Sequence, residues 1–260
     1  MDPLGRRFHV GPLGGRLLIV FAMALMAVTG YFGIRGDNPI AAAVQRPRVT
    51  PQQEVALGLQ AAPAMAQRYG GLSSDQAAQR RVDRVCHDLV EKTSARATPY
   101  DFDCHVLADP RTVNAFALPG GQVFVTAGLL ARLQTDGQLA GVLGHQIGHV
   151  AARHGAEHIA LARLGPGTTG AAVLAAYDPG NPASRRDPQV AALIGQLIDL
   201  RFSPQDELEA DRLGLRFMSE AGWDPRGMAQ VMRILVTSPG GSPEFFATHP
   251  HPSGPRSPGV

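Results

Sequence analysis

Residues 141–150 read Gly-Val-Leu-Gly-His-Gln-Ile-Gly-His-Val, and this stretch constrains the fold more than any other part of the chain. On a helix, His145 and His149 lie one turn apart on the same face, which is the spacing needed to bind one metal ion. The same helix carries three glycines at which another helix can approach closely: Gly141, Gly144 and Gly148. The stretch therefore predicts a buried helix that holds two metal ligands against a neighbouring helix.

Two histidines do not complete a metal site, so a further ligand must come from elsewhere in the chain. Glu207 and Asp211 share one face of a predicted helix at i and i+4, whereas Glu209 points about 200° away from Glu207. Ala210 and Gly214 flank the shared face and match the glycines of the first helix. This pairing predicts Glu207 as the carboxylate ligand and Asp211 as the acceptor for the free N–H of a ligand histidine.

The acidic stretch also has a simpler interpretation. Glu207 and Glu209 lie near the start of their helix, where carboxylates are favourable on a solvated face without any metal. A rival histidine pair, His154 and His158, has the same i, i+4 spacing, but residue 154 lies five positions beyond His149. On a continuous helix that offset turns the rival pair away from the metal-binding face, so we expect structural or surface roles for both.

Helical patterns dominate the chain, and a small sheet is expected just before the metal-binding helix. Residues 102–106 alternate apolar and polar side chains, and residues 114–118 and 122–126 flank the turn Pro119-Gly120-Gly121. The chain after residue 237 is rich in proline and glycine and is predicted to be irregular. These patterns predict an α+β, mainly helical domain.

Residues 17–34 (LLIVFAMALMAVTGYFGI) contain no charge and are just long enough to span a bilayer as a helix. Three arginines precede this run, so the positive-inside rule places residues 1–16 in the cytoplasm and the chain after the run outside. We therefore expect an uncleaved transmembrane anchor, with a cleaved signal peptide as the alternative.

The remaining organisation follows from composition. Residues 35–49 contain two prolines and no periodicity, which is typical of a linker, and residues 50–252 are expected to form one domain followed by a disordered tail, 253–260. The formal net charge is only +2, and no clustered basic face indicates a nucleic-acid partner. The oligomeric state is not indicated by any pattern.

Several blocks of the sequence, in the right order, resemble one family. GVLGHQIGHVAARHGAEH followed by DELEADRLGLRFM is similar to the membrane-associated zinc metallopeptidases of the HtpX-like and Oma-like group, the gluzincin peptidase family forty-eight. VNAFALPGGQVFVTAGLL, AGWDPRGM and ATHP agree with the same group, so the resemblance covers roughly residues 50–252. It implies a zincin-like metallopeptidase fold in a single-pass protein of the bacterial inner membrane, with the domain in the periplasm or another extracytoplasmic space.

The resemblance also implies a site. It implies one zinc ion per chain, bound by His145, His149 and Glu207, with His249 as a gate or fourth ligand on a nearby loop. It further implies that a strand beside the cleft holds an extended peptide by strand addition, through Asn114, Ala115, Phe116 and Ala117. The substrates implied are unfolded or misassembled envelope proteins.

Gln146 departs from the family pattern, which has glutamate at this position as general base toward the attacking water. Glutamine has almost the same shape and can hydrogen-bond, but its amide cannot take a proton at neutral pH. Since removing a general base typically costs ~10²–10⁴-fold, we predict a metalloendopeptidase scaffold with impaired catalysis. The alternatives are a non-catalytic peptide-binding or chaperone-like module and a purely structural zinc; the glutamine itself fits either natural divergence or a deliberate inactivating substitution.

Cys86 and Cys104 are the only cysteines, and both occupy inward-facing positions on neighbouring predicted elements. If the anchor prediction holds, both lie outside the membrane, where disulfides persist. They are expected either to form a disulfide or to remain two ordinary buried thiols.

Overall fold

The computed structural model describes residues 49–165, 167–237 and 243–249. The chain divides into two compact units, residues 1–46 and 47–260, and all of the described residues belong to the second. The predicted cytoplasmic segment, anchor and disordered tail lie outside the described residues, as does most of the predicted linker. In the part of the chain that the structure describes, no helix has both the length and the apolar character needed to cross a membrane.

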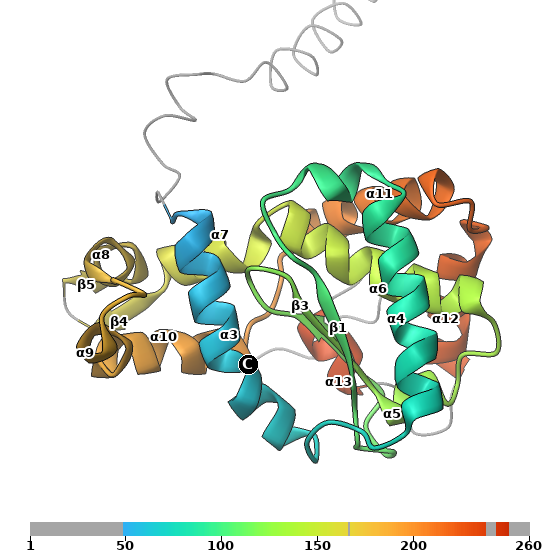
Figure 1. Ribbon diagram of the computed structural model, residues 1–260, viewed down its shortest axis with the longest axis horizontal. Helices are drawn as coiled ribbons and strands as arrows, with labels where there is room; N and C mark the ends of the chain where they lie inside the picture. The colour runs from blue at the N-terminus through green and yellow to red at the C-terminus, as the bar shows by residue number, and fades with distance from the viewer. Residues whose placement is uncertain (1–48, 166, 238–242, 250–260) are drawn as a thin grey trace, which may run out of the picture. The chain divides into compact units, whose positions relative to one another are not determined.

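Helices dominate the described residues, as the sequence predicts, and two small sheets accompany them (Figure 1). The helices are α3 (Pro51–Arg68), α4 (Gln76–Glu91), the 3-10 helix η1 (Ser94–Ala97), α5 (Ala127–Leu130), α6 (Asp136–Ala151), α7 (His154–Leu161), α8 (Gly170–Ala176), α9 (Pro182–Arg185), α10 (Pro188–Ile198), α11 (Pro204–Glu220), α12 (Arg226–Thr237) and α13 (Pro243–Thr248). The strands are β1 (Asp103–Leu107), β2 (Ala115–Ala117), β3 (Gln122–Thr126), β4 (Arg163–Gly165) and β5 (Thr168–Thr169).

The three-stranded sheet has the order β1-β3-β2. β1 runs parallel to β3, and β2 runs antiparallel to it, with Phe116 opposite Phe124. Gly120 and Gly121 have φ values of 84° and 110° in the turn between β2 and β3, a region that glycine adopts without steric cost. Since β3 lies between the other two strands, β1 and β2 are the two edges of this sheet.

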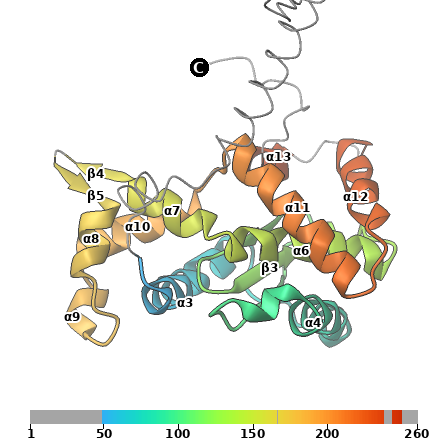
Figure 2. The same cartoon turned by 90° about the horizontal axis from the view of Figure 1, so that it is seen from above.

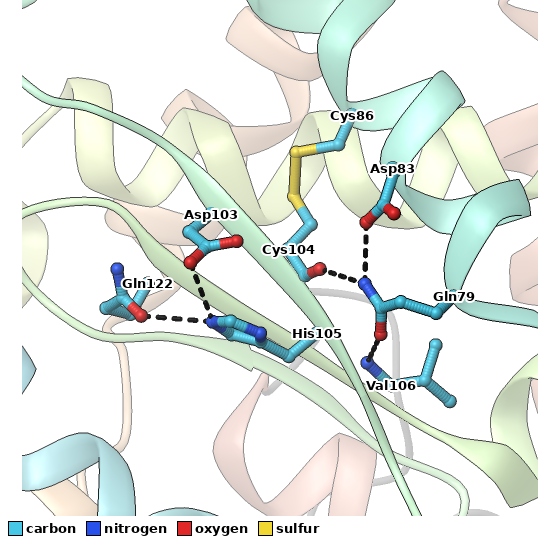
Figure 3. The surroundings of a disulfide bond; sticks show 8 residues. All are labelled: Gln79, Asp83, Cys86, Asp103, Cys104, His105, Val106 and Gln122. Atoms are coloured by element: carbon cyan, nitrogen blue, oxygen red, sulfur yellow. Dashed lines mark hydrogen bonds and ion pairs between the residues drawn. A yellow bond between two sulfur atoms is a disulfide. The ribbon is translucent and has the colours of Figure 1, made fainter. Parts of the chain in front are cut away.

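The outer edge of β1 is covered by a side chain from α4 (Figure 3). The Gln79 amide donates to the Cys104 carbonyl at 2.7 Å and accepts from the Val106 N–H at 2.9 Å, as a neighbouring strand would. Cys86 of α4 and Cys104 of β1 form a disulfide with a Cα–Cα distance of 6.4 Å. α4 is therefore tied to this edge both covalently and by hydrogen bonds.

α6 lies at the centre of the domain (Figure 2), packed against α11, α12, α4 and β2. It begins after the N-cap Thr135, whose side chain accepts from the Gln138 N–H, and every residue from Gln138 to Val150 is buried. The main apolar cluster joins side chains of α4, α6, α11 and the sheet, among them Val82, Leu89, Val123, Leu143, Ile147 and Phe217. A second cluster packs α3 against α8 and α10.

α6 and α11 approach each other through their small residues. A Cβ added to Gly148 would lie 2.7 Å from the Ala210 carbonyl oxygen, and one added to Gly214 would lie 2.8 Å from the His145 nitrogen. Real Cβ atoms do not come so close to backbone atoms, so these positions require glycine. The matching small faces predicted from the sequence therefore meet.

The prediction of irregular chain after residue 237 is wrong for residues 243–248, which form α13. Pro243 stands at the first helical position, where its missing N–H costs nothing, and Phe245 is buried against the main apolar cluster. Phe246 packs against the same cluster, so the burial of aromatic side chains favours a helix here although the surrounding sequence is rich in helix breakers.

Gly148→Ala is expected to lower the free energy of unfolding by about 1–3 kcal/mol, because the methyl group collides with the α11 backbone. Chemical denaturation of the two proteins measures the difference. Gly195→Ala is the matched control, because Gly195 is exposed within α10 and an added Cβ would meet nothing within 4 Å. Helix propensity alone should then raise the free energy of unfolding of this variant by up to about 1 kcal/mol. Equal effects at both positions would contradict the close contact.

Candidate metal centre

Two imidazoles of α6 face each other inside the domain. Nε2 of His145 and Nε2 of His149 lie 3.1 Å apart, and the side chains are 10% and 2% exposed. Two nitrogens that each lie 2.0–2.1 Å from a tetrahedral zinc ion would be about 3.3 Å apart. The helix therefore holds this pair at close to the separation that a shared ion requires.

α11 contributes a carboxylate to the same point. Glu207 is 5% exposed, and its oxygens lie 3.4 Å from His145 Nε2 and 3.5 Å from His149 Nε2. The helix starts at Pro204 after a capping box, in which Ser203 and Asp206 satisfy each other's backbone N–H groups. This fixed start places Glu207 on the face of α11 that packs against α6.

His249 completes a group of four side chains. One ligand atom from each of His145, His149, Glu207 and His249 lies within 4.8 Å of the others. The His249 ring stacks on Phe245 with centroids 4.8 Å apart, and its Nδ1 lies 2.9 Å from the Thr248 hydroxyl. The end of α13 therefore directs the Nε2 edge of this ring toward the other three side chains.

The chemistry of this group fits a divalent cation. Glu207 Oε1 and Gln146 Oε1 are both buried without a hydrogen-bond partner, and a buried acceptor without a partner costs roughly 1–3 kcal/mol. Imidazole nitrogens and a carboxylate are the donors that zinc and similar ions take in proteins. A cation in the middle of the group would satisfy the orphaned carboxylate oxygen.

The electrostatics favour positive charge at the same place. Burial lowers the pKa of His145, but hydrogen bonds to the Asp211 and Glu207 carboxylates outweigh it and raise the pKa to about 9. Asp211 Oδ1 lies 2.8 Å from His145 Nδ1, on the far side of the ring from Glu207. Burial and the charges of the neighbouring histidines hold the pKa of His149 well below its usual value. The carboxylate field that favours a charged imidazole also favours a bound cation.

Gln146 is fully buried next to the first histidine. Its Nε2 lies 3.3 Å from the Ala115 carbonyl oxygen, to which it donates, and 3.2 Å from His249 Nε2. An ionised glutamate could donate to neither atom. The bond to the β2 carbonyl is therefore one that an ionised carboxylate could not make, whereas His249 Nε2 can accept from the amide only while it does not bind a metal.

β2 lies beside this centre, but its residues differ in accessibility. Phe116 stacks on Phe124 in the core with centroids 5.2 Å apart, and Asn114 is 1% exposed. The N–H of Ala115 is bound by the Asn114 side chain at 2.9 Å, and its carbonyl by Gln146. By the alternation of the ladder, Ala117 turns its backbone groups away from β3, toward the outer edge.

A small cavity of about 30 Å³ adjoins this group of candidate ligands. Its walls combine the faces of His145, Glu207 and Asp211 with the apolar side chains of Val142, Met228, Val231, Met232 and Phe245. The metal-binding group therefore borders an apolar hollow between α6, α12 and α13.

His154 was expected to have a structural or surface role away from His149, and the structure contradicts the surface position and the separation from His149. Its side chain is 3% exposed, and its Nδ1 lies 3.0 Å from His149 Nδ1. Arg153, with a φ of 64°, lies between the end of α6 at Ala151 and the start of α7 at His154, so the two helices are not continuous and the continuous-helix argument fails. His158 remains half-buried and bonds to Asp206 at 2.7 Å, as a structural residue would.

Phe202 also belongs to the centre and was not predicted. Its ring stacks on His149 with centroids 3.8 Å apart. It immediately precedes the N-cap Ser203, a position at which an apolar side chain often packs against the structure near a helix start. That rule was the only signal in the sequence that could have found it.

Residues 76–254 match Peptidase family M48, and the chain belongs to this family. The chain is 32% identical over 180 residues to the putative beta-barrel assembly-enhancing protease of Vibrio cholerae, an alignment of 66% of this chain and 36% of the relative. It is 33% identical over 177 residues to the Escherichia coli beta-barrel assembly-enhancing protease, covering 63% and 34% of the two chains.

A mitochondrial relative matches as well. The chain is 36% identical over 152 residues to the mitochondrial metalloendopeptidase OMA1 of Schizosaccharomyces pombe, covering 57% of this chain and 43% of the relative. In each of these comparisons the chain spans less than half of the relative's length.

Zinc titration against a competing chromophoric chelator is expected to show tight binding of one ion per chain. Glu207→Gln should weaken binding by more than the roughly 10–100-fold that loss of an outer partner costs, because a ligand oxygen is replaced by a neutral amide. Glu157→Gln, on the exposed face of α7, is the control and should leave the affinity unchanged. Unaltered binding in Glu207→Gln would show that α11 does not supply a ligand.

Proposed function

We propose that this chain is a zinc-binding metalloendopeptidase-type domain whose peptide cleavage is impaired by Gln146. His145, His149 and Glu207 bind the ion, Asp211 orients His145, and His249 is a gate or fourth ligand. The observation that carries the proposal is the position of Gln146, a buried amide beside the ligand His145, with Nε2 bonded within the protein and Oε1 without a partner.

Zinc would supply Lewis-acid chemistry to this site by polarising a carbonyl group and lowering the pKa of water. The surrounding side chains determine whether the site can also carry out the proton transfers of peptide hydrolysis. At neutral pH the Gln146 amide can accept or donate a hydrogen bond, but it cannot take up the proton that a general base removes or return it to a leaving amine. Glu207 and Asp211, the acidic residues lining the cavity, are both engaged with His145.

The proposed substrate is an extended peptide held along the outer edge of β2. Gln79 already covers the β1 edge, so β2 is the edge of this sheet at which a strand could be added. Gln146 links Ala115 to the ligand helix, and Ala117 directs its backbone groups outward. The segment Asn114 to Ala117 would then contribute mainly through Ala117, because the other three residues are buried.

A non-catalytic peptide-binding or chaperone-like module is the second candidate. The same observation favours it, because a glutamine at this position has the shape of a catalytic glutamate while its amide N–H is bonded to the edge strand β2. In this function the zinc-containing cleft and β2 would hold a peptide without cutting it.

The setting of the domain is proposed from the relatives and from the sequence. Two relatives are named beta-barrel assembly-enhancing proteases, which supports unfolded or misassembled envelope proteins as substrates. Residues 17–34 would anchor the chain in a bacterial inner membrane, with residues 1–16 in the cytoplasm and residues 35–49 linking to a periplasmic domain, 50–252.

Hydrolysis of fluorescently labelled casein tests the proposal. Gln146→Glu restores a proton acceptor, so its zinc-loaded form is expected to cleave casein roughly 10²–10⁴ times faster than the parent chain, and a chelator should abolish the gain. Gln196→Glu, an exposed position on α10, is the matched control and should cut no faster than the parent.

The outcomes separate the two candidates. Equal cleavage by the parent and Gln146→Glu would show that residue 146 does not occupy the general-base position. If neither protein cuts but both retain labelled casein peptides in a zinc-dependent manner, the peptide-binding module replaces the peptidase as the account of this domain.

A further inference from the structure

The two ligand histidines of α6 have different outer partners. His145 meets a carboxylate directly, with its Nδ1 2.8 Å from Asp211 Oδ1. His149 meets another imidazole instead, with its Nδ1 3.0 Å from His154 Nδ1. A metal-binding histidine usually directs its second nitrogen to a carboxylate, carbonyl or water, so an imidazole in this place requires an explanation.

The hydrogen-bond directions along this contact are fixed by the chemistry of the rings. A His149 ring that binds a metal through Nε2 carries its proton on Nδ1 and can only donate there. His154 Nδ1 must then accept, which leaves the His154 proton on Nε2. That nitrogen lies 3.4 Å from Glu209 Oε2 and 3.8 Å from Asp206 Oδ1, so it faces acceptors of the right kind.

The surrounding residues hold this arrangement in place. Asp206 is fixed by His158 at 2.7 Å and by the Ser203 N–H at 2.8 Å, within the cap of α11. Arg153, just before His154, has a left-handed backbone, and its side chain is paired with the fully buried carboxylate of Glu54. His154 is thus buried between Arg153, whose position is fixed by Glu54, and the carboxylates at the start of α11.

We propose that His154 is a positioning residue for the metal ligand His149, fixing the tautomer and orientation of its ring and transmitting the field of the α11 carboxylates. The inference rests on the proposed metal site. It makes α11 the source of one ligand, Glu207, and of the outer carboxylates behind both histidines: Asp211 directly, and Glu209 and Asp206 through His154.

The zinc affinity of four variants of the full chain, measured by chelator competition, tests this role. His154→Phe keeps the ring volume and removes the acceptor, so the affinity should fall roughly 10–100-fold. His154→Asn and His154→Gln are matched in polarity, but only the asparagine amide reaches the Nδ1 position that faces His149. Asparagine should therefore recover most of the affinity and glutamine should not. His87→Phe, the same exchange at an exposed position of α4, should bind as the parent does.

Each result has a defined meaning. If the parent binds zinc and His154→Phe binds it equally well, the positioning role is wrong while the metal site stands. If asparagine and glutamine weaken binding equally, His154 acts through packing alone and the role is again wrong. If the parent binds no zinc, the metal site and this inference fail together. Thermal unfolding of each zinc-free variant shows whether it folds. If His154→Phe does not fold, the comparison of the asparagine and glutamine variants decides whether His154 positions His149.

Discussion

The close contact between α6 and α11 is the interaction on which the site depends. Gly148 lies against Ala210 and Gly214 against the backbone at His145, so the two helices approach more closely than larger residues would permit. At this separation a carboxylate of one helix reaches two imidazoles of the other within 3.5 Å. The glycines are therefore as necessary to the metal-binding group as its ligands are, although they contribute no donor atom.

A second constraint is electrostatic. Gathering three imidazoles and a carboxylate in a buried space is costly unless their charges and donors are matched. Asp211 compensates one histidine directly, and His154 connects the other to the acidic start of α11. Gln146 is buried beside His145, donates its amide N–H to the Ala115 carbonyl of β2, and lies 3.2 Å from His249 Nε2. The centre of this chain thus holds a group of side chains that could bind a metal, next to a neutral amide that is proposed to stand at the general-base position.

Local patterns in the sequence predicted the helices that carry the site, because the spacing of His145 and His149 and of Glu207 and Asp211 is set by helix geometry alone. The contact of His154 with His149 was missed because one left-handed residue, Arg153, interrupts the helix on which the spacing argument relied. α13 was missed because the burial of Phe245, a tertiary contact, outweighs its breaker-rich surroundings. The bond between Cys86 and Cys104 could not be decided either, since it depends on how α4 lies against β1.

The contact between α6 and α11 is proposed to build one zinc site from imidazole and carboxylate donors. X-ray absorption at the zinc edge of the stoichiometrically loaded full chain tests it most directly. We expect a first shell of nitrogen and oxygen atoms at about 2.0–2.1 Å, with the outer-shell scattering of at least two imidazoles and no sulfur, since both cysteines are in a disulfide. A first shell of oxygen atoms alone, without imidazole scattering, would contradict the account.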